Sequence, residues 1–383
     1  MKKRDEDKST KVHSQSHSQS VVESDLNRAG EDHPQRPEAV AESVTQTAME
    51  VDEPTTVPVK TKPTPRVILD RGVDSHFHLD RLARRVRGEK FMCKSMALSS
   101  VLQEASPKNP PLLQLQMAVA SFCDRPFQLR LQKEMRAEKD KSRTLLEDLQ
   151  RDPRLRLSFG LHPKCVSPLI FRVTEEAKRL KMLLSLPNTV AFGEVGLDYT
   201  EPEADWQEQR LFLEQLLGLM KGSLDQIPVV VHCRENNIPK RSARDDLCGI
   251  LETYLGRDQE IQLHYFNGKL EDVEFWLNAF PNAHFSVSGM VGRFNQEQKE
   301  ALVRIPPERL LLETDAPFCP LLASGTEIMR RPYSTPYTID LVATCVGRIL
   351  KKTRAEVLKI TTQNAQRFFR SLAGRYCPDG WNG

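Results

Sequence analysis

The sequence predicts an α/β protein: a (β/α)8 barrel of the TIM type that follows a disordered polar tail. Two observations predict this fold class. From Val67 onward, short apolar runs alternate with longer amphipathic segments, and eight such runs can be distinguished. The spacing also fits, because seven βα steps separate His76 from Asp315 at roughly 34 residues each, near the ~31 expected of a ~250-residue barrel. Eight strands in such steps close a parallel barrel.

The first 65 residues differ in composition from the rest of the chain. They contain no aromatic residue and no cysteine, so they cannot bury enough apolar surface to offset the entropy of ordering them. The Pro/Thr/Lys linker at 53–66, EPTTVPVKTKPTPR, favours extended conformations. We expect residues 1–65 to be a disordered tail and residues 66–375 to form the barrel domain. The tail is either a solvated segment without a role in catalysis, or a carrier of a localisation signal (Lys2-Lys3-Arg4) or of a phosphorylated site that binds other proteins.

Charge, cysteine usage and hydropathy limit the classes of function. The 383 residues include 55 Lys+Arg and 52 Asp+Glu, a formal net charge of +3, so no global basic field would hold nucleic acid by charge alone. None of the eight cysteines belongs to a C-x-x-C pair, the first residues are charged, and no apolar run is long enough to span a bilayer. We expect reduced thiols, a location in the nucleus or the cytoplasm, and no membrane contact.

The apolar runs define the expected strands, which are Gly72–Phe77, Leu115–Cys123, Arg154–Leu161, Thr189–Glu194, Pro228–His232, Ile261–Tyr265, His284–Val287 and Leu310–Thr314. The clearest helix is expected over Asp205–Lys221, where apolar residues recur at i, i+3, i+4 and i+7 and Asp205 is placed to cap the N-terminus. Further helices are expected over Thr174–Leu186, Ser242–Leu255, Leu270–Phe280, Gln296–Ile305 and Thr335–Leu350. The step between Asp80 and Leu115 contains the Pro-broken run SPKNPPLLQ, which predicts an insertion or an irregular loop.

Polar residues end the apolar runs at the same end each time. They come from five strands and are His76, His78, Glu194, His232, His264 and Asp315. In a (β/α)8 barrel all strand C-termini gather at one rim, where such enzymes place their chemistry. One His or one acid at a strand end is more often structural, but two acids and four imidazoles buried together without a metal would be costly.

These residue types predict a metal site. Imidazoles and carboxylates are the usual ligands of divalent zinc, manganese, iron and magnesium, and His-rich sets favour the transition metals. Six protein ligands exceed what one catalytic ion needs with a position left open for water, so we expect two ions that share a carboxylate.

Seven motifs in order resemble the TatD-related deoxyribonuclease family, within the amidohydrolase-like barrels. They are DSHFHLD (74–80), GLHPK (160–164), GEVGLDY (193–199), VHCRE (231–235), LHYFNG (263–268), SGMV (288–291) and LLLETDAPF (310–318), and the resemblance covers Gly72 to about Phe369. It implies a metal-dependent hydrolase acting on ester bonds, a nuclease that removes nucleotides from DNA or RNA ends, 3'-5'. It also implies two divalent ions per chain, as Mg²⁺, Mn²⁺ or Zn²⁺; the family is usually described as Mg²⁺-dependent, whereas four His ligands favour a softer ion in one site.

The resemblance assigns roles to the residues that match its motifs. His76, His78 and Asp315 would hold the first ion, and His232 and His264 would complete the second. Glu194 would be the bridging carboxylate. Asp315 would also take the proton of the attacking water, so that Glu194 and Asp315 are the expected catalytic residues.

Four further residues are expected to contact the substrate. Arg234, two residues past His232, has a guanidinium that matches phosphate oxygens with two hydrogen bonds. His162 and Lys164 follow the third strand and would bind a phosphate, unless His162-Pro163 only fixes the turn. Tyr199 would stack on a base or sugar, unless it packs in the core. The family often has a second His where Lys164 stands, and Tyr265 and Asn267 replace smaller residues of its HxFxG motif, so these departures bear on substrate preference.

Two rival interpretations compete with a nuclease. A barrel hydrolase of C–N or lactone bonds often bridges its metals with a modified lysine, whereas the fourth strand ends here in Glu194. A non-catalytic scaffold would be indicated by loss of a ligand, and none is lost. We therefore expect a nuclease whose partner is its nucleic-acid substrate and which acts as a monomer.

Overall fold

The computed structural model describes residues 69–105, 113–137, 144–236, 241–320 and 333–370. All of them lie in one compact unit, Pro65–Gly383. The expected tail, residues 1–65, lies outside the described residues, as do residues 371–375 at the end of the expected barrel domain.

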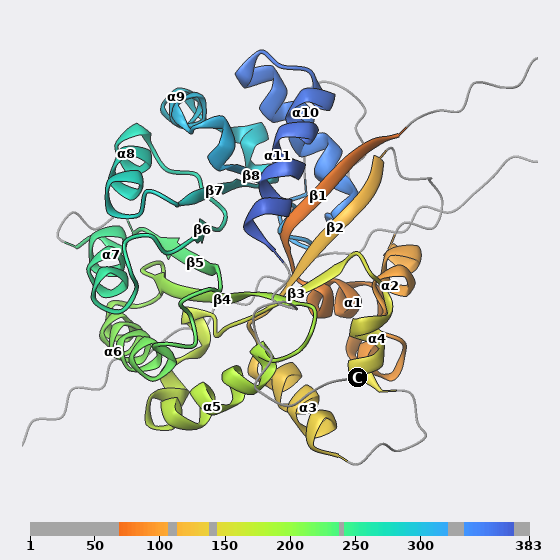
Figure 1. The fold of residues 1–383 in the computed structure, drawn as a ribbon, viewed down its shortest axis with the longest axis vertical. Coiled ribbons are helices and arrows are strands. Elements are labelled where there is room, and N and C mark those ends of the chain that lie inside the picture. The colour runs from red at the N-terminus through yellow and green to blue at the C-terminus, as the bar shows by residue number, and fades with distance from the viewer. Residues whose placement is uncertain (1–68, 106–112, 138–143, 237–240, 321–332, 371–383) are drawn as a thin grey trace, which may run out of the picture. The chain divides into compact units, whose positions relative to one another are not determined.

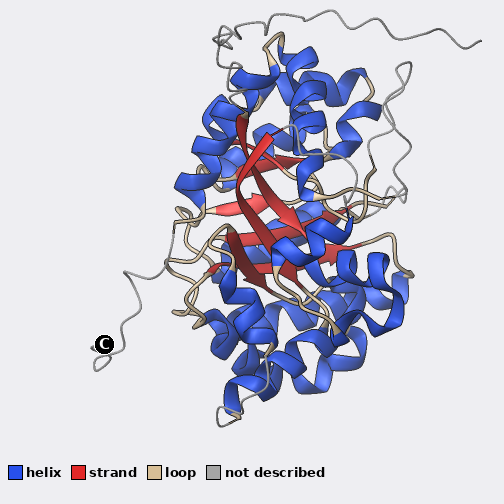
Figure 2. Cartoon of the chain, turned by 90° about the vertical axis from the view of Figure 1, so that its right-hand side faces the viewer, coloured by secondary structure: helices blue, strands red, loops and turns tan. Residues whose placement is uncertain are grey.

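Eight parallel strands form one sheet in the order in which they occur in the sequence (Figure 1). The strands are β1 (Asp70–Phe77), β2 (Leu113–Phe122), β3 (Leu155–Phe159), β4 (Thr189–Asp198), β5 (Val229–Arg234), β6 (Ile261–Leu263), β7 (His284–Val287) and β8 (Leu310–Leu312). Each is paired in parallel with the next, and helices surround them (Figure 2). The predicted TIM barrel is confirmed.

The first and last strands meet just beyond the C-terminal end of β8. Asp315 N donates to His76 O at 3.0 Å, and His78 N donates to Ala316 O at 2.7 Å. The buried carboxylate of Asp74 adds a side-chain clamp, because it accepts from Thr314 N at 2.9 Å and from the Thr314 hydroxyl at 2.5 Å. The barrel closes directly beside two of the predicted metal ligands.

Eleven α-helices lie within the described residues: α1 (Leu79–Arg87), α2 (Leu98–Ala105), α3 (Arg125–Arg136), α4 (Leu145–Arg151), α5 (Val173–Leu184), α6 (Glu203–Met220), α7 (Ala243–Tyr254), α8 (Leu270–Ala279), α9 (Gln296–Arg304), α10 (Ile339–Leu350) and α11 (Arg354–Phe368). Short 3-10 helices span Gly88–Cys93, Pro163–Cys165, Ser167–Arg172, Gly289–Arg293, Pro307–Arg309 and Pro336–Thr338. None of these helices is long and apolar enough to cross a membrane.

Two predictions about the elements need correction, and one choice between alternatives is decided. Pro202, and not Asp205, is the N-cap of α6, and Asp205 lies in its first turn, where a carboxylate still favours the positive end of the helix. Between Asp80 and β2 the structure has the first of the two expected alternatives, an insertion, formed by α1, a 3-10 helix and α2; residues 106–112 of the Pro-broken run lie outside the described residues. β4 continues to Asp198, beyond its predicted end at Glu194.

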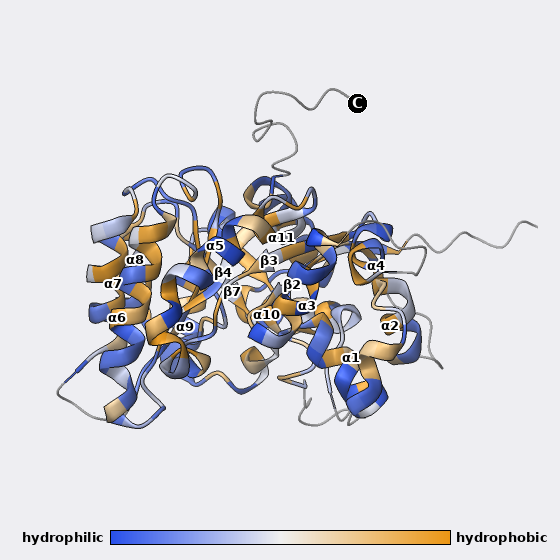
Figure 3. Ribbon diagram, turned by 90° about the horizontal axis from the view of Figure 1, so that it is seen from below, coloured by the Kyte–Doolittle hydropathy of each residue, from blue (hydrophilic) through white to orange (hydrophobic). Residues whose placement is uncertain are grey.

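The alternation of side chains along β5 separates two cores. Val229 and Val231 belong to the larger apolar cluster, whereas Val230 belongs to a smaller cluster that includes Phe368 and Phe369. His232 follows Val230 by two residues and so shares its face of the strand. The covering helices carry polar and apolar residues together, as α6 and α7 show in Figure 3. The predicted apolar face of α6 is buried at Leu213, Leu216, Leu217 and Met220.

Candidate metal centre

The C-terminal ends of the strands bring all six predicted ligands together. His76 lies in β1, Glu194 in β4 and His232 in β5. His78, His264 and Asp315 follow β1, β6 and β8 in the loops. Each of the six residues is at most 6% exposed. Five of them, all except His76, line a cavity of about 500 Å³ at this rim.

Glu194 lies between two groups of imidazoles, and each of its oxygens faces one group. Oε2 is 3.7 Å from His76 Nε2 and 3.8 Å from His78 Nε2. Oε1 faces three nitrogens: His232 Nδ1 at 2.6 Å, His162 Nε2 at 3.5 Å and His264 Nε2 at 3.5 Å. This division of the oxygens is what a carboxylate shared by two ions requires.

Ligand spacing supports a metal on the Oε2 side. His78 Nε2 lies 3.4 Å from Asp315 Oδ1, and nitrogen and oxygen ligands at ~2.0 Å in a tetrahedral shell are about 3.3 Å apart. Neither ring nitrogen of His76 has a hydrogen-bond partner among the described residues, and neither has Asp315 Oδ1. Buried polar atoms without a partner are rare unless a ligand satisfies them.

Burial and neighbouring charges set the protonation of these groups. Burial, and next the charge on His264, hold the pKa of His76 well below its usual value, so this imidazole is neutral and able to bind a metal. Burial raises the pKa of Glu194, but His264, His162 and His232 outweigh it and the pKa lies well below the ordinary value. The carboxylate is therefore ionised inside the protein.

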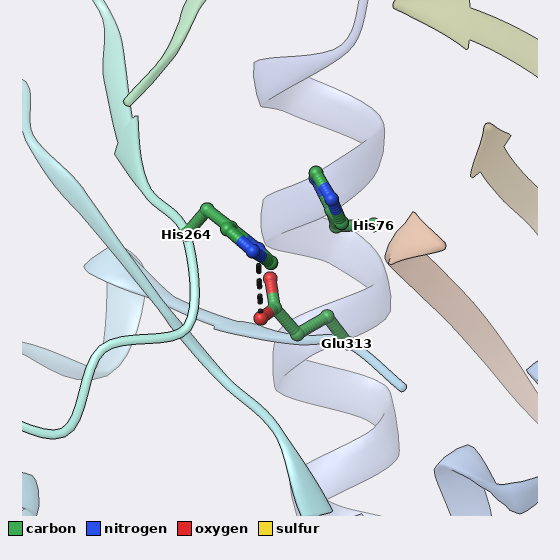
Figure 4. A group of neighbouring side chains, drawn as sticks. All are labelled: His76, His264 and Glu313. Atoms are coloured by element: carbon green, nitrogen blue, oxygen red, sulfur yellow. Dashed lines mark ion pairs between the residues drawn. The ribbon is translucent and has the colours of Figure 1, made fainter. Parts of the chain in front are cut away.

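Glu313 orients the His264 ring through the ring nitrogen that does not face Glu194 (Figure 4). Its Nδ1 lies 3.0 Å from Glu313 Oε1, and its ring stacks on that of His76 with centroids 3.7 Å apart. Burial lowers the pKa of His264, but the carboxylates of Glu313 and Glu194 outweigh it and raise the pKa to about 9. This site therefore favours a positive charge at His264, which either a proton or a cation can provide.

Asp198 is a site residue that the sequence analysis did not assign as a ligand. It ends β4, and its Oδ2 lies 3.0 Å from His232 Nε2. Burial raises its pKa, but His232 and Thr200 outweigh it, so the pKa lies below the usual value. Asp198, His162 and His232 have ligand atoms close enough to hold one ion. The even spacing from Glu194 was the available signal, since alternate strand residues share a face.

The four predicted substrate residues have different surroundings. His162 and Lys164 line the cavity, as does Arg234, whose guanidinium lies over the Tyr265 ring, 4.6 Å from its centroid. Lys164 Nζ is paired with Glu201 at 2.5 Å and with Asp198 at 3.5 Å. Burial lowers the pKa of His162 to about 3, so its ring is neutral.

Tyr199 does not fit the prediction that it stacks on a base or sugar. Its side chain is 1% exposed and its ring stacks on Trp206, with centroids 4.3 Å apart. Its hydroxyl donates to Asp246 Oδ2 at 2.5 Å. Tyr199 is therefore a core residue, and it does not line the cavity.

Arg81, Cys123 and Asp124 lie beside the candidate ligands, after the ends of β1 and β2, and the sequence predicted no role for them. Arg81 lines the cavity, donates to both oxygens of Asp124 at 2.8 and 3.1 Å, and reaches Cys123 Sγ at 3.3 Å. Cys123 directly follows β2 and belongs with His78 and Glu194 to one group of potential metal ligands. Their position after a strand was the only signal in the sequence.

A family model described as TatD related DNase matches residues 73–370 of the chain. The chain is 30% identical over 250 residues to the 3'-5' RNA nuclease TATDN2 of Homo sapiens, a match that covers 64% of this chain and 28% of the human protein. It is also 30% identical over 216 residues to the 3'-5' ssDNA/RNA exonuclease TatD of Pantoea vagans, covering 55% of this chain and 76% of the bacterial one.

Among solved structures, an uncharacterized amidohydrolase from Saccharomyces cerevisiae superimposes with a TM-score of 0.60 at 19% identity, over 78% of this chain and 100% of the yeast chain. This likeness concerns the fold. The matched region of the human relative is less than a third of that protein's length.

Proposed function

This chain belongs to the TatD-related DNase family, and from that membership we propose that it is a metal-dependent nuclease. It would hydrolyse phosphodiester bonds of DNA or RNA and remove nucleotides in the 3'-5' direction, as the names of its human and bacterial relatives state for those proteins. Nucleic acid would be its partner, and the chain would act as a monomer.

The division of Glu194 between two groups of ligands carries this proposal. His76, His78 and Asp315 would hold one ion beside Oε2, and His232 and His264 would hold the other beside Oε1. Asp198 lies close enough to join the second group. The ions would be Mg²⁺, Mn²⁺ or Zn²⁺; when bound, such a pair supplies an activated water and stabilises negative charge on the phosphate.

The chain's own residues would bind the phosphate and receive the proton. Asp315 would bind the ion through Oδ1, and its other oxygen, Oδ2, would accept the proton of the attacking water; the only hydrogen-bond contact of Oδ2 among the described residues is with Cys319 Sγ at 3.7 Å. Arg234 forms no ion pair within the described part of the chain and lines the cavity, so its full charge is available to a phosphate. Lys164 would contribute less, because Glu201 and Asp198 already neutralise it.

An assay with end-labelled single-stranded DNA and RNA tests the proposal. The purified chain should shorten the 5'-labelled strands from their 3' ends when Mg²⁺, Mn²⁺ or Zn²⁺ is present and stop when a chelator is added. Glu194→Gln keeps the size of the side chain but removes the shared charge, so it should abolish turnover. Glu300→Gln, on the exposed side of α9, is the matched control.

Two results would contradict the proposal. One is cleavage that survives both the chelator and Glu194→Gln. The other is hydrolysis of a lactone or a cyclic amide by metal-loaded protein that leaves nucleic acid intact, which would move the chain to the C–N or lactone hydrolases.

A further inference from the structure

Cys123 places a thiol inside the metal centre. It directly follows β2 and is 1% exposed. Its Sγ lies 3.6 Å from Glu194 Oε2 and 4.0 Å from His78 Nδ1. The thiol is therefore on the same side of Glu194 as His76 and His78, and not on the side of His232 and His264.

The distances fit a shared coordination shell. Sulfur at ~2.3 Å and oxygen at ~2.0 Å from a tetrahedral ion are about 3.5 Å apart. The separation of Cys123 Sγ from Glu194 Oε2, 3.6 Å, is close to this value and slightly smaller than the 3.7 and 3.8 Å that separate the same oxygen from His76 and His78. Measured from Glu194 Oε2, the sulfur is as well placed as either imidazole.

Two neighbours point independently to a ligand at this position. Asp315 Oδ1 is buried, has no hydrogen-bond partner among the described residues, and lies 3.4 Å from His78 Nε2. His78 Nδ1 lies 3.1 Å from the carbonyl oxygen of Ser121 and would donate to it, which leaves Nε2 as the metal-binding nitrogen. Asp315 Oδ1 is therefore open to a ligand, and the only hydrogen-bond contact of His78 Nε2 within the described part of the chain is with Arg81 Nη1 at 3.4 Å. Both atoms belong to the Oε2 side of Glu194, where the thiol also lies.

Arg81 supplies a hydrogen bond that a thiolate would need. Its guanidinium is held by two hydrogen bonds to Asp124 and also donates to Cys123 Sγ at 3.3 Å. A thiolate, Glu194 and Asp315 together would place three negative charges around one divalent ion. Asp124 already balances the charge of Arg81, so the contribution of Arg81 is the hydrogen bond that it donates to the sulfur, which would stabilise a thiolate.

We infer that Cys123 is a thiolate ligand of the ion held by His78 and Glu194, and that it makes this position selective for soft ions such as Zn²⁺ over Mg²⁺. The inference rests on the metal-dependent function proposed above. When the metal–sulfur bond forms, the thiol loses its proton to the solvent and nothing is oxidised or reduced. Thiolates prefer zinc, whereas magnesium prefers oxygen ligands.

Cobalt substitution tests the inference without any activity measurement. Full-length protein loaded with Co²⁺ should show a sulfur-to-cobalt charge-transfer band in the near ultraviolet, with cobalt content measured by elemental analysis. Cys123→Ser should lose the band and still bind cobalt. Cys233→Ser is the matched control, since Cys233 follows the ligand His232 but joins no group of metal ligands among the described residues, and it should keep the band.

Ion selectivity gives a second readout. Cys123→Ser should weaken Zn²⁺ binding at least about tenfold and change Mg²⁺ binding far less, because only the softer ion gains from the thiolate. Wild-type protein that binds cobalt without the band would overturn the inference and leave the proposed function standing. A band that persists in Cys123→Ser would also overturn it and point to Cys319, whose Sγ lies 3.7 Å from Asp315 Oδ2. Wild-type protein that binds no cobalt would overturn both.

Discussion

His76 and Glu194 respond to the same burial in opposite ways. Burial removes the positive charge from His76, while the imidazoles around Glu194 keep its negative charge in place. The result is a neutral donor beside a charged donor, which is the combination that a divalent cation needs.

Arg234 is the residue whose replacement best separates substrate binding from metal binding. Arg234→Ala should lower kcat/KM on DNA or RNA roughly 10–150-fold. This corresponds to a loss of about 1.5–3 kcal/mol of transition-state stabilisation, because a charge-assisted hydrogen bond to phosphate is lost. Arg234→Lys should recover only part, since an ammonium cannot form the two-pronged contact. Steady-state kinetics and metal analysis measure both effects.

The control for this variant is Arg241→Ala, because Arg241 is exposed and is already paired with Asp246. It should leave kcat/KM within a factor of about two. Equal losses in the two variants would mean that general positive charge, and not a contact of Arg234, assists binding.

His284 makes the stability of the protein depend on pH. Burial, opposed by its hydrogen bond to Asn282 and reinforced by Arg309 and Arg367, lowers the pKa of His284 to about 4. In the unfolded chain the pKa of His284 is near 6.5, so below that pH the unfolded state takes up a proton that the folded state does not. The contribution of neutral His284 to stability is therefore fully present above pH 6.5 and is lost as the pH falls toward 4. The loss is at most about 3 kcal/mol.

Urea unfolding of wild type and His284→Gln, both in chelator, measures this effect. The difference in unfolding free energy between wild type and His284→Gln should shrink from pH 7 to pH 4.5, because only the wild type has an imidazole that takes up a proton when it unfolds. A difference that stays constant over this range would show that His284 does not titrate as the structure implies.

The six proposed metal ligands were accessible to sequence reasoning, whereas Asp198, Cys123 and Arg81 were not. The ligands were visible because each ends an apolar run, and that pattern places them at one rim. Asp198 was hidden because a buried Glu in mid-strand looks like a strand end. For Tyr199 the second expected alternative, packing in the core, holds; the sequence left the choice open because its partners, Trp206 and Asp246, come from other segments.

At the scale of elements, β4 and β5 must come unusually close beside the site. Gly196 has φ +151°, and a Cβ there would overlap the carbonyl oxygen of His232. The strands therefore approach only if position 196 lacks a side chain.

Gly196→Ala should destabilise the protein by more than about 3 kcal/mol, because backbone strain and displacement of β5 add together. It should also weaken metal binding, since His232 would move. Gly249→Ala is the control: this glycine lies in α7, and apart from the helix's own backbone no atom lies within 4 Å of where its Cβ would be. Alanine there should increase stability by about 0.5–1 kcal/mol. Urea unfolding and metal titration give both values; equal stabilities would refute the close approach.

The strands were more predictable than the helices. β7 spans the predicted residues, because Phe285 and Val287 alternate with the polar residues His284 and Ser286, a pattern that predicts a short strand. α10 begins at Ile339, four residues later than predicted, since Pro336 stands in a 3-10 turn before it. α11 was not predicted, and its buried residues include Thr361, Thr362 and Asn364, which weaken an apolar pattern.

At the scale of the whole molecule, the candidate metal centre joins strands that are distant in sequence. The single carboxylate of Glu194 faces imidazoles that are carried by β1, β5 and the loop after β6. Metal binding should thus stabilise the barrel as a unit, because the ligands converge only in the folded chain.

Removing the metal should therefore lower the melting temperature. At a free metal concentration 100 times its Kd, one bound ion adds about 2.7 kcal/mol of stability, which corresponds to a rise in Tm of about 5–10 °C. Calorimetry with Zn²⁺ or Mn²⁺ and with chelator measures the difference, and Glu194→Gln should show little of it. If chelation strips the metal, as elemental analysis would report, and Tm does not change, the ions do not hold the strands together and the ligands are arranged by the barrel alone.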